Sequence, residues 1–166
     1  SILITTSDDL AKNTSKEVDN FLANLSRYEI AKKSIDERGV IIVASNMEEA
    51  IELMNEIAPE HLEVMTKNPF ELLPFIKHAG AIFLGENTPE PIGDYIAGPN
   101  HTLPTGGTAK FYSPLNVENF LKKSSIISFS KKAINDLGES CALLADTEGL
   151  TAHAKSVRVR LEEKGE

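Results

Sequence analysis

The residues whose types could do acid–base chemistry begin with an adjacent pair, Glu60 and His61, in the segment Pro59-Glu60-His61. Neighbouring side chains of an extended chain point to opposite faces, so this carboxylate and imidazole can serve two separate proton transfers without contacting each other. Histidine is also the side chain that titrates near neutral pH. The dipeptide alone is weak evidence for such a role, and an ordinary surface pair is the simpler interpretation; both remain open.

Asp94 and His101 lie in a stretch from residue 85 to 107 that holds nine of the chain's 18 glycines and prolines. A loop of this length inside a compact domain is usually functional or disordered. Interspersed apolar residues such as Ile92 and Leu103 favour an ordered, packed loop. A turn-forming aspartate is the alternative for Asp94. Because ordered loops often carry binding and catalytic residues, Asp94 and His101 are candidates for one site.

Glu148 and His153 form a third candidate group near the end of the chain. Five residues of an ideal helix put two side chains about 140° apart. The two therefore share a site only if Glu148 precedes the helix, which Gly149 permits. An exposed histidine without a role is the alternative for His153. For His78, which follows Lys77 at a predicted helix end, an interaction with the helix C-terminus is explanation enough.

Composition and charge exclude several classes of function. Seventeen Lys and Arg against 25 Asp and Glu give a net charge of −8. This charge repels phosphate backbones and anionic lipids, so we expect neither nucleic-acid nor membrane binding. Cys141 is the only cysteine and no run of about 20 apolar residues occurs, so a cytoplasmic location is expected. The glycine-rich fingerprints that bind nucleotide phosphates are absent from the sequence.

Alternating strands and helices must position these candidates. Apolar and β-branched runs predict strands at residues 2–5, 40–43, 62–65 and 81–84, and the run at 40–43 is typical of a strand buried on both faces. Amphipathic patterns predict helices over about 7–27, 45–59 and 69–76, the second opened by a capping box of Ser45 and Glu48. The alternation predicts an incomplete, Rossmann-like α/β layer fold with a largely parallel sheet.

The chain beyond residue 113 has a different character. Its pattern is mostly helical, with a short strand at 126–129 and helices over about 130–144 and 150–161 whose apolar stripes have no core of their own. The sequence therefore divides into an α/β domain, residues 1–113, and a helical tail, residues 114–166. It opens at Ser1 directly in a strand-like run, which suggests a piece of a longer protein.

Five segments occur with a distinctive order and spacing. They are Ala58-Pro59-Glu60-His61-Leu62-Glu63, residues 79–85, Thr88-Pro89-Glu90, residues 93–105 with Gly93-Asp94-Tyr95 and Pro99-Asn100-His101, and residues 148–153. Together they closely resemble the C-terminal portion of the histidinol dehydrogenase family, and the resemblance covers the whole chain.

The resemblance implies oxidation of L-histidinol to L-histidine through the aldehyde histidinal, the last reaction of histidine biosynthesis, with NAD and a bound zinc. It implies that His61 is the general base and that Glu60 activates the water that attacks the aldehyde. Asp94 and His153 would be zinc ligands. The residues that would contact the substrate are Glu60, His61, Asp94, His101, Glu148 and His153.

The resemblance also implies parts that these 166 residues do not contain. The family's remaining zinc ligands, a glutamine and a histidine, and its NAD-binding domain are expected upstream of Ser1. The chain alone is therefore expected to hold no NAD site, to bind zinc weakly and to be inactive. The family is a homodimer whose tail crosses to the partner, which implies that Glu148 and His153 complete the other subunit's site.

Two other classes of function remain open. One is a metal-dependent hydrolase that uses Glu60, His61, Asp94, His101 and His153 without NAD, and zinc-dependent hydrolysis by the 166-residue chain would favour it. The other is a non-catalytic assembly module of the same fold. A scaffold needs none of the acid–base side chains, and this argues against the second alternative.

Overall fold

The computed structural model describes residues 1–161, so residues 162–166 of the predicted tail lie outside the described residues. The chain divides into two compact units: the first ends at Leu121 and the second begins at Lys122. The sequence-based boundary falls earlier, at 113/114. Residues just after that boundary stay with the first unit, where the Leu115 N–H donates to the Thr102 carbonyl at 2.9 Å.

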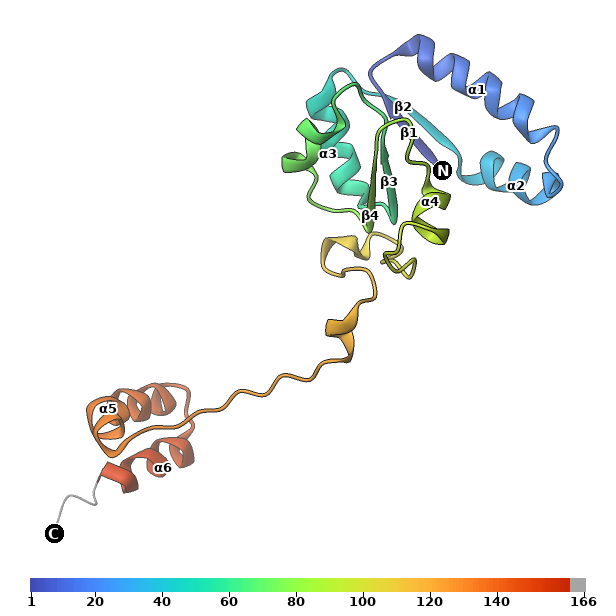
Figure 1. Ribbon diagram of the computed structural model, residues 1–166. Coiled ribbons are helices and arrows are strands. Elements are labelled where there is room, and N and C mark those ends of the chain that lie inside the picture. Colours follow the sequence, from blue (N-terminus) through green and yellow to red (C-terminus); the bar gives the residue numbers. More distant parts are fainter. Residues whose placement is uncertain (162–166) are drawn as a thin grey trace. The chain divides into compact units, whose positions relative to one another are not determined.

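The first unit contains two pairs of parallel strands (Figure 1). Strand β1 (Ile2–Thr5) pairs with β2 (Val40–Val43), and β3 (His61–Val64) pairs with β4 (Ala81–Leu84). All four predicted strands are present, and β3 begins one residue earlier than predicted, so that His61 is its first residue. The α/β fold with parallel strands and a helical C-terminal part is confirmed.

Helix α1 (Asp8–Leu22) begins as predicted, because the N-cap Ser7 hydroxyl accepts a hydrogen bond from the Leu10 N–H at 3.2 Å. The prediction that it continues to Arg27 is wrong. The Asn24 side-chain amide donates to the Asn20 carbonyl and ends the helix, and a second helix, α2 (Tyr28–Arg38), follows after a turn.

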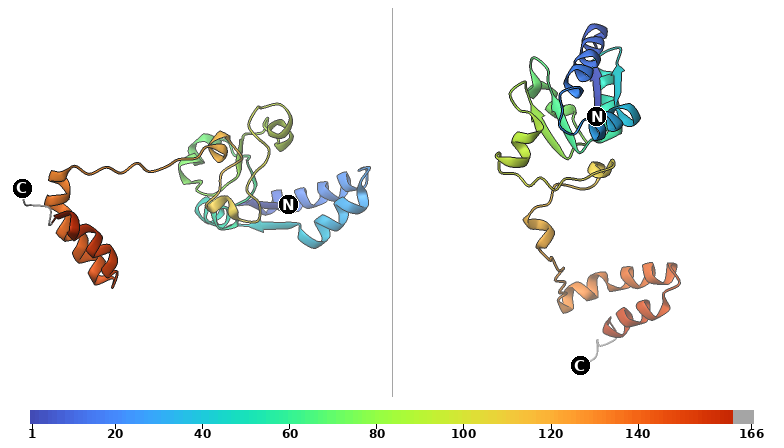
Figure 2. Two further views of the ribbon diagram at one scale, coloured as in Figure 1. Left: turned by 90° about the horizontal axis from the view of Figure 1, so that it is seen from below. Right: turned by 90° about the vertical axis from the view of Figure 1, so that its right-hand side faces the viewer.

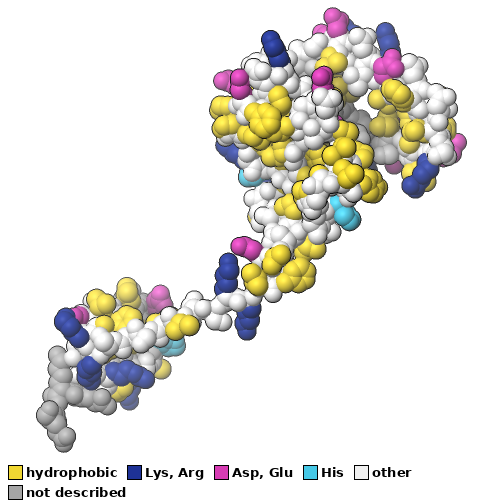
Figure 3. All heavy atoms as spheres, in the orientation of Figure 1, with side chains coloured by type: hydrophobic (Ala, Val, Ile, Leu, Met, Phe, Trp, Pro, Cys, Tyr) yellow, Lys and Arg dark blue, Asp and Glu magenta, His cyan; other side chains and the backbone are white. Residues whose placement is uncertain are grey.

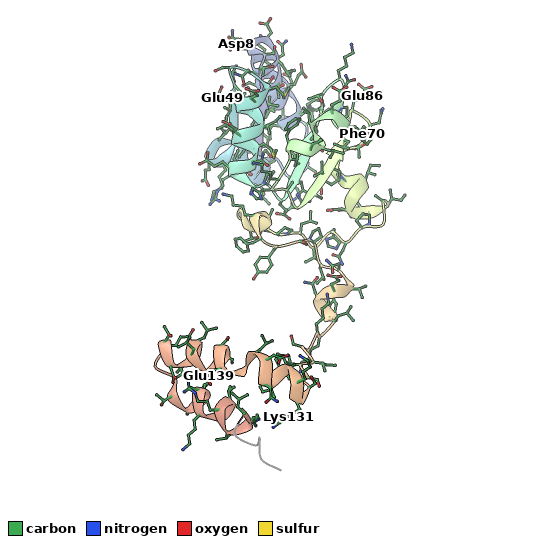
Figure 4. The ribbon with its side chains drawn as sticks, turned by 90° about the vertical axis from the view of Figure 1, so that its left-hand side faces the viewer. Asp8, Glu49, Phe70, Glu86, Lys131 and Glu139 are labelled. Carbon is green, nitrogen blue, oxygen red and sulfur yellow. The ribbon has the colours of Figure 1, made fainter. Side chains whose placement is uncertain are left out.

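Helix α3 (Met47–Ile57) starts one residue later than the predicted capping box. Asn46 is the N-cap, and its side-chain oxygen accepts from the Glu49 N–H at 2.9 Å. The Glu49 carboxylate in turn accepts from the Ser45 N–H, which lowers the pKa of Glu49. Figure 4 shows Glu49 at this end of the helix. Glu48, the acid expected in this role, therefore does not cap α3.

Asn55 on α3 fixes the turn that leads into β4. Its amide nitrogen donates to the carbonyl of Phe75 at 2.9 Å, and its amide oxygen accepts from the N–H groups of Lys77 and His78. Phe75 ends the 3₁₀ helix η1 (Pro69–Phe75), the form that the predicted helix at 69–76 takes. One side chain therefore replaces the backbone pairing that this turn lacks.

We expect Asn55→Ala to lower the free energy of unfolding by about 1–2 kcal/mol, because it leaves backbone groups of the turn without a partner. The measurement is urea unfolding followed by circular dichroism. Asn13→Ala is the matched control, because Asn13 is an exposed asparagine of α1 and its replacement should leave the midpoint unchanged. Equal midpoints for wild type and Asn55→Ala would contradict this account.

The second unit is a pair of helices, α5 (Lys131–Thr147) and α6 (Thr151–Leu161), packed against each other (Figure 2). Small residues allow the close approach, and Ala142 and Ala154 are almost completely buried between the helices. Arg158 on α6 forms ion pairs with Glu139 and Asp146 on α5, both at 2.8 Å.

The predicted strand at 126–129 is wrong. Those residues form neither helix nor strand, and Ile126 is 95% exposed. None of the strands in residues 1–161 pairs with the segment, so its backbone groups are left to bond with water, and a short apolar run without a neighbouring strand does not form a strand.

Apolar side chains gather in several patches on the surface of the first unit (Figure 3). On β2, Val40 is 46% and Val43 45% exposed, so the strand is not buried on both faces as its sequence predicts. Within residues 1–161, every helix is too short or too polar to cross a lipid bilayer.

Candidate functional site

One face of the β3–β4 pair carries the central side chains. Side chains alternate along a strand, so His61 and Glu63 share a face of β3. In the register of the pair, Glu63 is opposite Phe83 of β4, which brings Phe83 to this face as well. The rings of His61 and Phe83 lie 6.0 Å apart between centroids, tilted by 35°.

A short helix, α4 (Glu90–Tyr95), lies against this face. The sequence predicted a loop over 85–107, so the helix is a correction, and it changes the setting of Asp94. The residue is not a turn former: it sits on α4, one turn after Glu90. Side chains four residues apart on a helix point the same way, so both carboxylates face the same region.

Two contacts hold α4 in place. The Glu63 carboxylate accepts a hydrogen bond from the Glu90 N–H at 2.8 Å, which links β3 to the start of the helix. Gly93 packs directly on Phe83, because a Cβ atom at residue 93 would lie 2.5 Å from a ring carbon of Phe83. Only a glycine allows this approach without displacement of the helix or the ring.

The result is a cluster of one imidazole and two carboxylates. His61 Nε2 lies 3.5 Å from Glu90 Oε1 and 4.0 Å from Asp94 Oδ1. All three side chains are about one-third exposed or less, and Nε2 itself is buried without a hydrogen-bond partner. Burial and a hydrogen bond with Asp94 raise the pKa of Glu90. Two carboxylates thus face a nitrogen that nothing in residues 1–161 satisfies.

The same three residues have a donor set that suits zinc. One ligand atom from each of His61, Glu90 and Asp94 lies within 4.8 Å of the other two. Zinc binds imidazole nitrogen and carboxylate oxygen at about 2.0–2.2 Å, so donors around one ion lie up to roughly 4 Å apart. The unpartnered Nε2 of His61 and the two converging carboxylates fit a cation of this kind, or a hydrogen-bonding group of a ligand.

A cavity of about 320 Å³ opens beside the cluster. It lies between β4, α4 and the segment after α4, and Asp94 and His101 both line it. The structure therefore brings these two predicted residues to one cavity, with Asp94 shared between the cavity and the cluster. A volume of this size is at the lower end of the range for small-molecule sites.

Glu60 stands just before β3, and its backbone is held by the start of β4. The Ala81 N–H donates to the Glu60 carbonyl, and the Gly80 N–H donates to the Pro59 carbonyl, both at 2.9 Å. A Cβ atom on Gly80 would lie 2.5 Å from the Glu60 carbonyl oxygen. Glu60 precedes His61 immediately, so its side chain belongs to the opposite face of the strand.

Glu148 and His153 belong to the second unit. Glu148 is the C-cap of α5, Gly149 has a φ of +76°, and His153 lies in the first turn of α6. Glu148 therefore precedes the last helix, the condition that sequence reasoning set for a shared site. Both side chains are exposed. His78 is half-buried, and its N–H donates to Asn55.

Sequence reasoning assigned no role to Glu63, Glu90 or Gly93. All three stand in segments that it singled out, and Glu90 precedes Asp94 by the four residues of one helical turn. This four-residue spacing was the signal in the sequence that could have paired Glu90 with Asp94. It indicates a shared face only where the segment is helical, and glycine and proline in this segment predicted a loop.

The fold and the cluster together define the class: a parallel α/β protein whose strand-borne histidine faces two carboxylates of a short helix. The sequence profile of the histidinol dehydrogenase family matches residues 1–161. The chain belongs to the histidinol dehydrogenase family.

Individual relatives agree with the family match. The chain is 71% identical over 161 residues to the histidinol dehydrogenase of Sulfurimonas denitrificans and 66% identical to that of Wolinella succinogenes, in each case over 97% of this chain and 37% of the relative. The crystal structure of histidinol dehydrogenase from Elizabethkingia anophelis superimposes with a TM-score of 0.84 at 37% identity, over 97% of this chain and 37% of that one. The chain thus spans little more than a third of the length of these proteins.

Proposed function

We propose that the protein to which this chain belongs is a zinc- and NAD-dependent histidinol dehydrogenase, which oxidises L-histidinol to L-histidine through histidinal in the cytoplasm. Family membership supports the substrate and the reaction. The observation that carries the proposal is the unpartnered Nε2 of His61, which faces two carboxylates beside a cavity. An alcohol oxidation needs a base of this type, since the hydroxyl proton must leave as the hydride does.

His61 is the general base in this proposal. It accepts the proton of the substrate hydroxyl in the first oxidation and a proton again in the second. Glu60, on the opposite face at the start of β3, activates the water that attacks the aldehyde. The two strand-end backbone bonds from Gly80 and Ala81 fix the position from which both side chains project.

Asp94 and His153 are the zinc ligands of this chain in the proposal, and a glutamine and a histidine from outside these 166 residues complete the set. The fit rests on Asp94, whose carboxylate lines the cavity and lies 4.0 Å from the proposed base His61. Bound zinc supplies a template that orients the substrate and polarises its donor atoms. His101, which lines the cavity, contacts the substrate in this proposal.

The proposal extends to the assembly. The helical tail crosses to the partner in a homodimer with its helices α5 and α6, so that Glu148 contacts the substrate and His153 the zinc of the other subunit's site. The exposed ends of α5 and α6 that carry these side chains support this role. The NAD site lies in the part of the protein outside this chain, and residues 1–113 are the C-terminal part of the catalytic domain.

The test uses the complete polypeptide with added zinc. NADH formation with L-histidinol should be measured by absorbance, with ethanol as the control alcohol. We expect two NADH per histidinol and histidine as the product, because alcohol to carboxylate is a four-electron oxidation in two hydride transfers. Activity should be lost after chelation and return with zinc. No histidinol-dependent NADH formation would contradict the proposal.

A further inference from the structure

We propose that Glu63 is a positioning residue: its carboxylate holds the first turn of α4 against β3 and thereby sets the distance from His61 to Asp94 and Glu90. The inference rests on the proposed function for its metal and substrate. Glu63 has no role in that proposal, and it acts through α4 without contact to the reacting atoms.

Helix α4 has no capping side chain of its own. The N–H groups of a helix's first turn have no partner within the helix, and usually a Ser, Thr, Asp or Asn at the N-cap accepts one of them. Here Pro89 is the N-cap and makes no side-chain bond, and Pro91 has no N–H. The Glu63 carboxylate supplies the missing acceptor for the Glu90 N–H from another element.

The hydrogen bond between Glu63 and the Glu90 N–H joins two elements of the site. Glu63 and His61 are two residues apart on the same face of β3, so the bond ties the start of α4 to the strand that carries the proposed base. Glu90, whose N–H it holds, is also the residue whose carboxylate reaches His61 Nε2 at 3.5 Å. Asp94 follows one turn later at 4.0 Å. This hydrogen bond thus ties the helix that carries both acids to the strand that carries the imidazole.

Helix α4 depends on few contacts from other elements, and the Thr88 hydroxyl, which donates to the Leu84 carbonyl at 2.8 Å, ties the turn before the helix to β4 and not to β3. Helix α4 has six residues, too few for a stable isolated helix, so its position depends on contacts from outside. Gly93 on Phe83 supplies one such contact, but it is apolar and permits rotation about the point of contact. The Glu63 bond adds a second, directional point, and two points define how the helix lies on the sheet.

The experiment compares Glu63→Ala and Glu63→Gln in the complete polypeptide. Glutamine keeps an oxygen that can accept from the Glu90 N–H, and alanine does not. Zinc affinity, measured by competition with a chromogenic chelator, should fall about 5- to 10-fold for Glu63→Ala, the equivalent of one net hydrogen bond. Glu63→Gln should stay close to wild type. Glu86→Ala is the matched control, an exposed glutamate in the turn before α4 (Figure 4).

Kinetics provide an independent readout. The kcat with histidinol should fall for Glu63→Ala and recover with Glu63→Gln, while the KM for NAD stays unchanged in all variants. Wild-type zinc affinity in Glu63→Ala, or an equal loss in Glu63→Gln, would overturn the inference. If the wild-type protein failed to oxidise histidinol, the proposed function would be wrong, and the zinc titrations would still decide the role of Glu63.

Discussion

Replacing His61 by Asn should reduce kcat for histidinol oxidation by about 10²- to 10⁴-fold, the contribution of a well-placed general base. Asparagine has a similar size and can fill the space beside Phe83, so the fold should persist. Within residues 1–161 the Nε2 atom of His61 has no hydrogen-bond partner, so the substitution removes no structural hydrogen bond at this atom. The measurement is steady-state NADH formation by the complete polypeptide, with the thermal unfolding midpoint as a check of folding.

Glu60→Gln should affect a different step from His61→Asn: the second oxidation, from aldehyde to carboxylate, and not the first. If Glu60 activates water only after the aldehyde forms, the first hydride transfer survives in this variant and the second is lost. A single-turnover experiment should then give one NADH per histidinol for Glu60→Gln and almost none for His61→Asn. The double variant should match His61→Asn. Turnover undiminished in the double variant, or two NADH from Glu60→Gln, would refute the assignment of the two roles.

The second large effect is expected at Gly93. A Cβ atom at this position would lie 2.5 Å from a ring carbon of Phe83, closer than packed carbon atoms approach, so α4 or the ring must move. We expect Gly93→Ala to lower the free energy of unfolding by about 1–3 kcal/mol, the usual cost of overpacking. Because Asp94 follows directly, zinc affinity should also fall, by about 10- to 100-fold.

A compensating substitution separates this mechanism from a general loss of stability. Phe83→Leu removes the ring that the new methyl group meets, so the double variant Gly93→Ala/Phe83→Leu should bind zinc more tightly than Gly93→Ala alone. Phe83→Leu by itself is the control, and the four proteins form a double-mutant cycle. Chelator competition measures zinc affinity and urea unfolding measures stability. Additive effects of the two substitutions would show that the contact does not position Asp94.

The sequence predicted the elements whose signals are local. The strands β1, β2 and β4 stand where their apolar runs lie, and Ser7 begins α1 as its position predicts. The sequence did not identify Asn46 as the N-cap of α3, because Ser45 and Asn46 are both good N-cap residues. Only the hydrogen bond that the Asn46 side chain accepts from the Glu49 N–H decides between them. The end of α1 was missed because Asn24 acts through its side chain.

The sequence predicted which residue types form the candidate site, but it did not predict how they are arranged. His61, Asp94 and His101 were named from the sequence, and the structure places Asp94 beside both of the others. The setting of Asp94 depends on α4, and α4 depends on Glu63 from a strand 27 residues away along the chain. A helix with a proline N-cap and an acceptor from a distant strand leaves no local signal, so a reading of 85–107 alone predicts a loop.

The register of β3 and β4 has a consequence for which changes this chain tolerates. Glu60 and Ala81 share a backbone bond, and Gly80 leaves no room for a side chain beside that bond. A shift of β4 by one residue would turn Phe83 away from the face that His61 and Glu63 share and bring an apolar neighbour, Ile82 or Leu84, into its place. A single-residue insertion or deletion near Gly80 would therefore remove the ring on which Gly93 packs and turn over every side chain of β4 at once, whereas a substitution alters one group at a time. Length variation among relatives should therefore be confined to other turns.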